Sequence, residues 1–141
     1  MKYSYTYIWI DADGNVRSKV KVLSRCLNVS ELPDWTFDGS STGQAIGEKS
    51  DVIIKPVALF KNPFIVYKKD DPFKQLEGLC VICETYNKDG SLHEHNYRNS
   101  CMKTLNKAKE FDCEFGMEIE YVLLDRNNNP RSEEHTSELQ S

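Results

Sequence analysis

The chain has 141 residues and a formal net charge of −4, and it contains no basic stripe of the kind that binds nucleic acid. Its length suits one domain with a modest core. Its apolar runs are far too short to span a bilayer, and its first residues resemble neither a secretory signal nor a transit peptide. We therefore expect a cytoplasmic protein that contacts neither nucleic acid nor membrane.

The cysteines agree with that compartment. There are five of them, an odd number without a secretion signal, which indicates reduced thiols. Cys80 and Cys83 have the spacing of half a zinc site, but the sequence holds no second such pair. Because both lie inside an apolar run, we favour a buried strand over a zinc site.

The first elements predict a β-hairpin. Residues 5–10 are rich in β-branched and aromatic side chains, which is typical of a strand. Asp13 and Gly14 then form a hairpin-turn sequence. Residues 16–22 alternate, with the valines on one face and the basic residues on the other. The alternation predicts an antiparallel strand whose valine face is half-buried.

A long loop follows, over residues 28–51. Its centre reads Phe37-Asp38-Gly39-Ser40-Ser41. Glycine permits backbone angles that are closed to other residues, and Asp and Ser side chains bond to nearby backbone groups, so this centre predicts irregular structure. Ordered loops of this length are often functional. The alternative is a solvated surface loop.

Two further strands are predicted beyond the loop, at residues 52–54 and 79–86. The charged stretch from Lys61 to Gly78 between them is expected to be an exposed excursion. His93 and His95 follow the second strand and invite a metal-site interpretation. No other ligand chemistry lies near them in sequence, so we favour a solvated loop.

One helix is predicted. Asn96 suits the N-cap of a helix over residues 97–109. Cys101, Leu105 and Ala108 recur at helical spacing and would form its apolar face. Strands followed by a helix indicate an α+β class.

The strongest chemical pattern lies at residues 115–124. As a strand, this segment would carry one continuous apolar face, with Gly116, Glu118 and Glu120 on the other. The two carboxylates would lie roughly 6.5–7 Å apart along the backbone, which suits hard cations bound through oxygen. The alternative is an amphipathic strand whose polar face is solvated.

Several motifs in order resemble the eukaryotic-type glutamine synthetase family. They are Tyr7-Ile8-Trp9-Ile10-Asp11, Leu32-Pro33-Asp34-Trp35, Phe37-Asp38-Gly39-Ser40-Ser41, Lys49-Ser50-Asp51-Val52-Ile53-Ile54, Asn62-Pro63-Phe64, Asn96-Tyr97-Arg98 and Phe115-Gly116-Met117-Glu118-Ile119-Glu120-Tyr121. The resemblance implies a β-grasp-like N-terminal domain at residues 1–95. Residues 96–130 would be the truncated start of the family's α+β catalytic domain.

The resemblance also implies a function, the ATP-dependent ligation of ammonia to the γ-carboxylate of L-glutamate. Glu118 and Glu120 match the family's ligands for Mg²⁺ or Mn²⁺, although Ile119 replaces the usual glutamine between them. Asp38 resembles the aspartate that binds ammonium and removes its proton, and Ser41 would add a neighbouring oxygen. The ATP-binding residues are not assigned within this chain.

The family's quaternary structure implies that the partner is a copy of the chain itself. In the family's rings, the loop that carries Asp38 enters the active site of the adjacent subunit. Residues 1–130 alone would therefore be inactive, because most of the catalytic domain is missing from them.

Two segments depart from the family pattern. The stretch from Lys61 to Gly78 resembles an insertion, and Ile65 and Val66 stand where the family has basic residues. Residues 131–141 resemble the translation of a sequencing adapter, so we exclude them from the fold. The alternative for these last residues is a genuine polar tail.

Two rival functions remain open from the sequence. One is a non-catalytic β-grasp module that assembles without turning over substrate. The other is a different carboxylate–metal enzyme with the same strand pattern, although such an enzyme would have no reason to carry the Asp38 loop. Further Glu and His ligands and a glycine-containing ATP loop beyond Pro130 would discriminate the ligase from both.

Overall fold

The computed structural model describes residues 2–47, 49–63 and 76–130. The chain forms two compact units, residues 1–107 and residues 108–141. The centre of the predicted excursion and the predicted adapter-derived tail lie outside the described residues. No helix in the described ranges is both long and apolar enough to cross a membrane.

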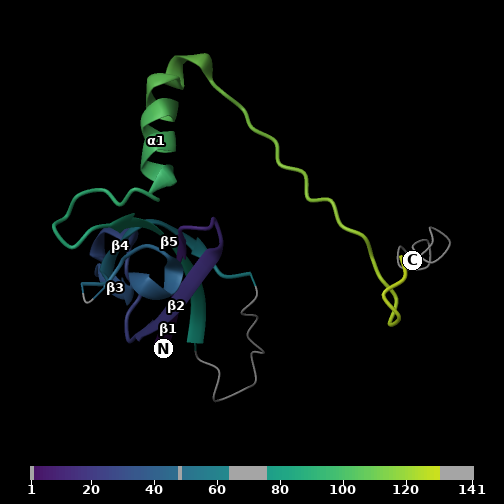
Figure 1. Ribbon diagram of the computed structural model, residues 1–141, viewed down its shortest axis with the longest axis horizontal. Helices are drawn as coiled ribbons and strands as arrows, with labels where there is room; N and C mark the ends of the chain where they lie inside the picture. The colour runs from purple at the N-terminus through teal and green to yellow at the C-terminus, as the bar shows by residue number, and fades with distance from the viewer. Residues whose placement is uncertain (1, 48, 64–75, 131–141) are drawn as a thin grey trace. The chain divides into compact units, whose positions relative to one another are not determined.

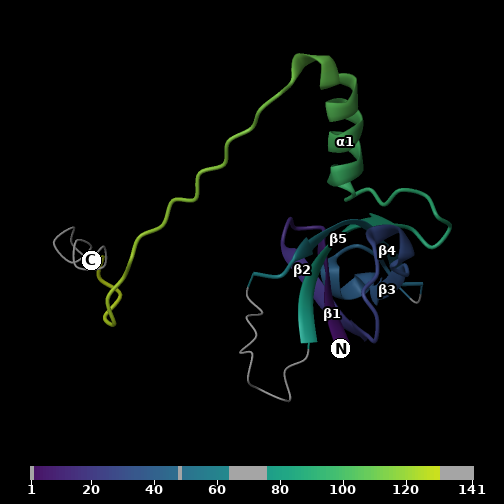
Figure 2. The ribbon, with the colours of Figure 1, turned by 180° about the vertical axis from the view of Figure 1, so that it is seen from behind.

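The first unit is built on one mixed sheet of five strands in the order β2-β1-β5-β4-β3 (Figures 1 and 2). Its strands are β1 Lys2–Ile10, β2 Val16–Leu23, β3 Trp35–Asp38, β4 Asp51–Lys61 and β5 Leu76–Tyr86. β1 and β5 run parallel and the other neighbours antiparallel. With the helix α1, Tyr97–Lys107, this arrangement is α+β and consistent with a β-grasp domain, as predicted.

The core lies on the face of β1 that carries alternate aromatic residues. Tyr5, Tyr7 and Trp9 are buried there, against Val81 and Cys83 of β5. The buried hydroxyls have partners, since Tyr7 donates to the Pro33 carbonyl at 2.9 Å and Tyr5 accepts from the Leu27 amide at 2.7 Å. Such pairing removes the cost of burying a polar group.

The strand predicted around Cys80 and Cys83 is confirmed as part of β5, and the Cys83 side chain is buried. All five cysteines of the chain are free thiols. Burial raises the pKa of the Cys83 thiol to about 12, so this sulfur is a poor nucleophile and a poor metal ligand at neutral pH.

The hairpin of β1 and β2 is confirmed, but the predicted burial of the valine face is wrong. Val16, Val20 and Val22 are 52–68% exposed. The basic face points inward instead, and the ammonium groups of Lys19 and Lys21 lie 3.6 and 4.3 Å from the centre of the Trp35 ring. β2 is an edge strand, so its inward lysine stems can cover an aromatic ring while their charged ends reach polar partners. Lys19 donates to the Thr36 carbonyl at 2.7 Å.

β4 is much longer than the predicted strand at residues 52–54. It continues through Pro56 to Lys61, with an irregularity in its pairing to β5 between Pro56 and Ala58. A bulge removes the need for the amide that proline lacks. The predicted excursion is correspondingly shorter, because Lys61 ends β4 and β5 begins at Leu76.

The helix prediction is confirmed in position and cap. The Asn96 side chain accepts a hydrogen bond from the Asn99 amide at 3.2 Å, the bond expected of an N-cap residue. The predicted apolar face is only weakly buried, since Leu105 and Ala108 are half-buried and Cys101 is exposed.

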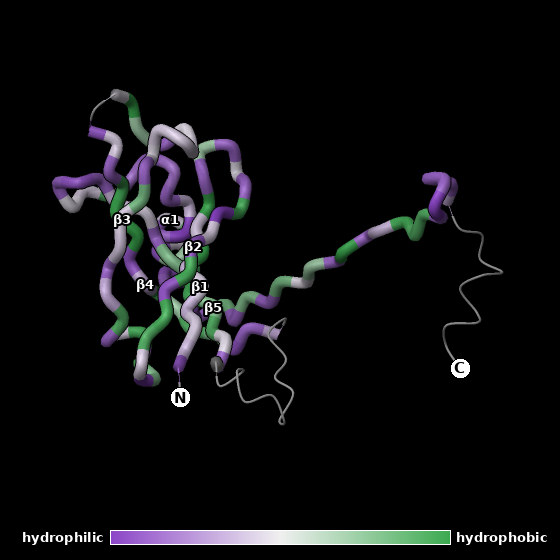
Figure 3. The backbone as a smooth tube through the Cα atoms, turned by 90° about the horizontal axis from the view of Figure 1, so that it is seen from below, coloured by the Kyte–Doolittle hydropathy of each residue, from purple (hydrophilic) through white to green (hydrophobic). Residues whose placement is uncertain are grey.

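In the second unit, the predicted strand at residues 115–124 is not formed. Residues 112–123 carry no regular secondary structure and are exposed, and only Leu124 makes an isolated bridge, to Pro130. Polar and apolar residues alternate along this stretch (Figure 3). A strand needs a neighbour for its backbone amides and carbonyls, and the described residues of this unit provide none.

We predict that the core of the first unit depends on Ile54, whose side chain is fully buried in β4. The change Ile54→Ala should lower the free energy of unfolding by about 2–5 kcal/mol, because it leaves a cavity among close-packed side chains. Urea denaturation followed by tryptophan fluorescence measures this loss. The control is Ile46→Ala, since Ile46 is 97% exposed. An equal effect of the two changes would contradict the assigned core.

Candidate functional site

Asp38 ends β3 and caps the short helical turn Gly39–Thr42. One carboxylate oxygen accepts from the Ser40 hydroxyl at 2.6 Å and from the Ser40 amide at 3.0 Å. The Ser40 hydroxyl, with help from the Ser50 hydroxyl and the Ser40 amide, lowers the pKa of Asp38 below its ordinary value. The turn therefore presents an ionised carboxylate on an exposed surface.

Ser41 lies in the same turn. Its hydroxyl donates to the backbone carbonyl of Asp38 at 2.8 Å, and its side chain is exposed. The two catalytic candidates from the sequence are therefore brought together by local geometry. Their side-chain oxygens carry different chemistry, an anionic acceptor on Asp38 and a neutral hydroxyl on Ser41.

Gly39 is required at this point by close packing. A Cβ atom there would lie 2.6 Å from the Val52 side chain and 2.9 Å from that of Ala45. Its amide donates to the Ser50 carbonyl at 2.7 Å, and its carbonyl accepts from the Gln44 amide at 2.8 Å. The backbone directly after Asp38 is thus bonded on both sides.

The turn is also hydrogen-bonded to the hairpin of β1 and β2 and to the segment before α1. The Ala12 amide donates to the Thr42 carbonyl at 3.2 Å, and the Gln44 side chain donates to the Ile10 carbonyl at 3.3 Å. The Nε2 atom of His93 lies 2.6 Å from the Gln44 carbonyl. The turn is therefore not a free loop.

His93 corrects the prediction of a solvated histidine, because it is only 5% exposed. Sequence reasoning missed this role, and no local signal could have found it. Its partner Gln44 lies 49 positions away along the chain. The neighbouring His95 is half-buried, with its ring centre 5.3 Å from that of His93.

Asp11 is a second carboxylate beside the turn, and unlike Asp38 it is fully buried. The residue after it, Ala12, donates to the turn at Thr42. It accepts from the Asn15 amide at 2.8 Å and from Arg17 Nε at 2.7 Å. Burial opposes its ionisation, but the bonds from Arg17, Asn15 and Asp13 outweigh burial and lower its pKa. This ion pair fixes the end of β1, to which the Asp38 turn is bonded through Ala12.

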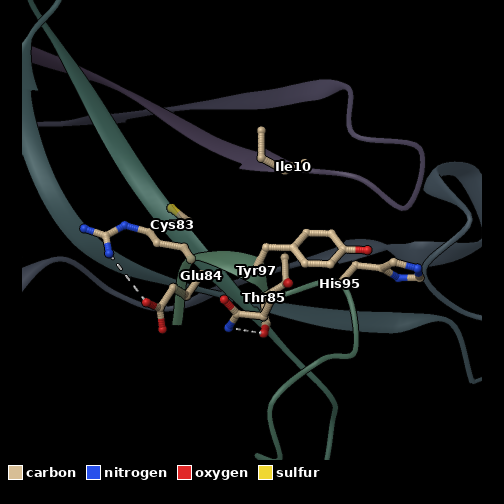
Figure 4. Close-up of a pocket in the computed structure, with 8 residues that line it drawn as sticks. Ile10, Cys83, Glu84, Thr85, His95 and Tyr97 are labelled. Carbon is tan, nitrogen blue, oxygen red and sulfur yellow. Dashed lines mark hydrogen bonds and ion pairs between the residues drawn. The ribbon is translucent and has the colours of Figure 1, made fainter. Parts of the chain in front are cut away.

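A small cavity of about 50 Å³ lies between the end of β5 and the start of α1 (Figure 4). Its polar lining includes Glu84, Arg98 and Asn96, and Glu84 and Arg98 approach to 3.7 Å. Asn96 donates to the Thr85 carbonyl at 2.9 Å. Such a volume holds one or two water molecules rather than a substrate.

Glu118 and Glu120 are exposed in the second unit. Among the residues that the structure describes, no three His, Cys, Asp or Glu side chains converge in a way that could hold a metal ion. Two carboxylates supply suitable oxygen donors for Mg²⁺ or Mn²⁺ but too few for a full shell. Their metal role stays a prediction.

Gly39→Ala tests the packing behind Asp38. We expect it to lower the free energy of unfolding by about 1–3 kcal/mol, because the added methyl group overlaps Val52 and Ala45. Thermal and urea unfolding measure the change. Gly116→Ala serves as the control and should alter stability by less than about 0.5 kcal/mol, since no atom lies within 4 Å of its added Cβ.

The Asp11 ion pair predicts a sensitivity to acid. A lowered pKa in the folded state means that ionised Asp11 stabilises the fold above about pH 4, and that this stabilisation is lost as pH falls further. Asp11→Asn should reduce stability at pH 7 and make its decline between pH 5 and pH 2 shallower. Urea denaturation across that range is the measurement. Asp13→Asn, at an exposed position, should keep the full decline.

No protein-family model matches the chain. The glutamine synthetase of Emericella nidulans is 45% identical over 119 residues, which make up 84% of this chain and 31% of that protein. That of Agaricus bisporus is 40% identical over 130 residues, or 92% of this chain and 34% of that protein. That of Yarrowia lipolytica is 38% identical over 125 residues, or 88% and 32%. The chain is a homologue of the glutamine synthetases and spans about a third of the length of these relatives.

Proposed function

We propose that this chain forms the N-terminal part of a glutamine synthetase, which ligates ammonia to the γ-carboxylate of L-glutamate with ATP. One observation carries the proposal. The similarity to glutamine synthetases covers most of the chain, and within it Asp38 stands ionised and exposed on a firmly bonded turn. The reaction needs such a group where ammonium binds.

Asp38 would act on ammonium in two ways. Its negative charge attracts the cation and its oxygens accept N–H hydrogen bonds. It would then accept a proton, which leaves neutral ammonia to attack the phosphorylated γ-carboxylate and displace phosphate. Because the bonds from Ser40 lower the pKa of Asp38, the carboxylate favours the charged state that binds ammonium. Ser41 would offer a second oxygen beside it.

Glu118 and Glu120 would bind the divalent metal ions, Mg²⁺ or Mn²⁺. When bound, such ions neutralise charge on the phosphates of ATP and orient the phosphoryl group that is transferred. Both glutamates are exposed, so they are open to ions and to ligands from other parts of a longer protein. Residues for ATP are not assigned in this chain.

The partner would be another copy of the same protein in a cytoplasmic ring. The Asp38 turn is exposed at Asp38, Ser40 and Ser41, so it can serve a site that another subunit completes. The bonds from Gly39 and Gln44 behind the turn would hold it in place as it does so. The chain alone would then be inactive, because it supplies only part of each site.

A hybrid enzyme tests the proposal. The matching stretch of the Emericella nidulans glutamine synthetase is replaced by that of this chain, and glutamine formation from glutamate, ammonium and ATP is measured. We expect turnover in the hybrid and none in residues 1–130 alone. Asp38→Ala should lower turnover by a factor of about 10²–10⁴, the usual contribution of a positioned acid–base group.

Matched variants separate specific roles from general damage. Asp34→Ala removes an exposed carboxylate directly before β3, at the opposite end of that strand from Asp38, and should leave turnover within about twofold, since exposed sites tolerate such changes. Glu118→Ala and Glu120→Ala should raise the Mn²⁺ concentration required for activity, whereas Glu114→Ala should not. A folded, assembled hybrid without turnover would favour the non-catalytic module, and full activity of the Asp38 variant would refute the assigned site.

A further inference from the structure

His93 is held by its backbone at the junction between the sheet and α1. Its amide donates to the Thr85 carbonyl of β5 at 3.2 Å, and its carbonyl accepts from the Asn96 amide at 2.9 Å. Asn96 in turn caps α1. The base of the His93 side chain is therefore fixed to two regular elements, which leaves the ring little freedom to move.

The ring uses both of its nitrogens. Nε2 lies 2.6 Å from the Gln44 carbonyl, which can only accept, so Nε2 carries a proton and donates it. Nδ1 accepts from the His95 amide at 3.2 Å and therefore carries none. The geometry specifies one tautomer, the neutral Nε2–H form.

Gln44 transmits this contact to the residue after Asp38. It is 5% exposed, and its amide donates to the Gly39 carbonyl at 2.8 Å, as does that of Ala45 at 3.2 Å. The Gln44 carbonyl and the Ala45 amide belong to one peptide group. A side chain that restrains this carbonyl therefore also restrains the amide that bonds to the Gly39 carbonyl. Gly39 follows Asp38 directly in the chain.

We propose that His93 is a positioning residue that fixes the Gly39–Thr42 turn through Gln44 and so sets the place of the Asp38 carboxylate. His93 acts on the turn from behind, through backbone atoms. The proposal deepens the proposed function and rests on it only for the role of Asp38. The restraint itself can be measured without any turnover.

The first experiment is nitrogen NMR of the imidazole rings in the chain, at a slightly alkaline pH where free imidazole is neutral. His93 should give the spectrum of the Nε2–H tautomer. A protonated Nδ1 on a neutral His93 ring would overturn the proposal, because that tautomer cannot accept from the His95 amide. This measurement needs no variant and therefore does not depend on whether a variant folds.

The second experiment is amide hydrogen exchange in three variants. His93→Leu should speed exchange of the Gln44 and Ala45 amides about tenfold, the effect of losing one hydrogen bond that holds a turn. His93→Gln should restore slow exchange, since its amide nitrogen can replace Nε2 as the donor. His95→Gln removes the neighbouring ring and keeps the backbone amide, so it should change exchange by less than about twofold. The Val81 amide in the core serves as the internal reference.

Two results would overturn the proposal. One is unchanged exchange at Gln44 and Ala45 in His93→Leu. The other is an equal increase at Val81, which would make His93 a general contributor to stability. If His93→Leu does not fold, fast exchange at Gln44 in the folded His93→Gln variant overturns the proposal. Either result would refute the role of His93 without deciding whether Asp38 is catalytic, which the hybrid enzyme tests separately. An inactive hybrid would likewise not change the conclusion from hydrogen exchange.

Discussion

The contact of aromatic rings between β1 and β3 shapes the first unit. Tyr7 and Trp35 meet edge to face with ring centres 5.5 Å apart, and Trp9 and Phe37 lie with ring centres 4.5 Å apart. In the sheet order, two strands separate β1 from β3. These rings can touch only if the sheet curls until its edge strand reaches over the buried face of β1. Such pairs add about 0.5–1.5 kcal/mol each beyond the area they bury.

The curl places the candidate site. It brings the end of β3, where Asp38 stands, next to the end of β1, where Ile10 and Ala12 bond to the turn. The charged group is exposed, while the residues behind it are packed and hydrogen-bonded. A functional group on a loop needs such a support, because a freely moving carboxylate would lose the advantage of position. The same aromatic contacts that complete the core therefore orient the turn.

The features that the sequence predicts correctly depend on near neighbours. The Asp13-Gly14 turn and the Asn96 cap are each decided within a few residues, and both are found where expected. The Asp38–Ser40 bonds are equally local. The proximity of Ser41 to Asp38 is decided within the same few residues, so it could be predicted without any knowledge of the rest of the fold.

The features that the sequence predicts wrongly depend on distant partners. Alternation in β2 is real, but which face is buried depends on the curl that brings Trp35 against the lysines. His93 is buried where its ring meets the Gln44 carbonyl, which lies 49 positions away along the chain. The strand expected around Glu118 requires a neighbouring strand, and the described part of its unit offers none. Local pattern gives the periodicity of a segment, and tertiary contacts decide its environment.

The two sets of candidate residues differ in how completely the chain builds them. The Asp38 turn receives all the support described above from within the first unit, so its geometry is defined by residues 1–107. A hard cation needs about six oxygen ligands, and Glu118 and Glu120 are two exposed carboxylates in a stretch without regular structure. Under the proposed function, the sheet unit would thus bring a finished ammonium-binding group. The metal centre would be finished only by ligands beyond those that the described residues bring together, and the proposed inactivity of the chain alone follows from this incomplete centre.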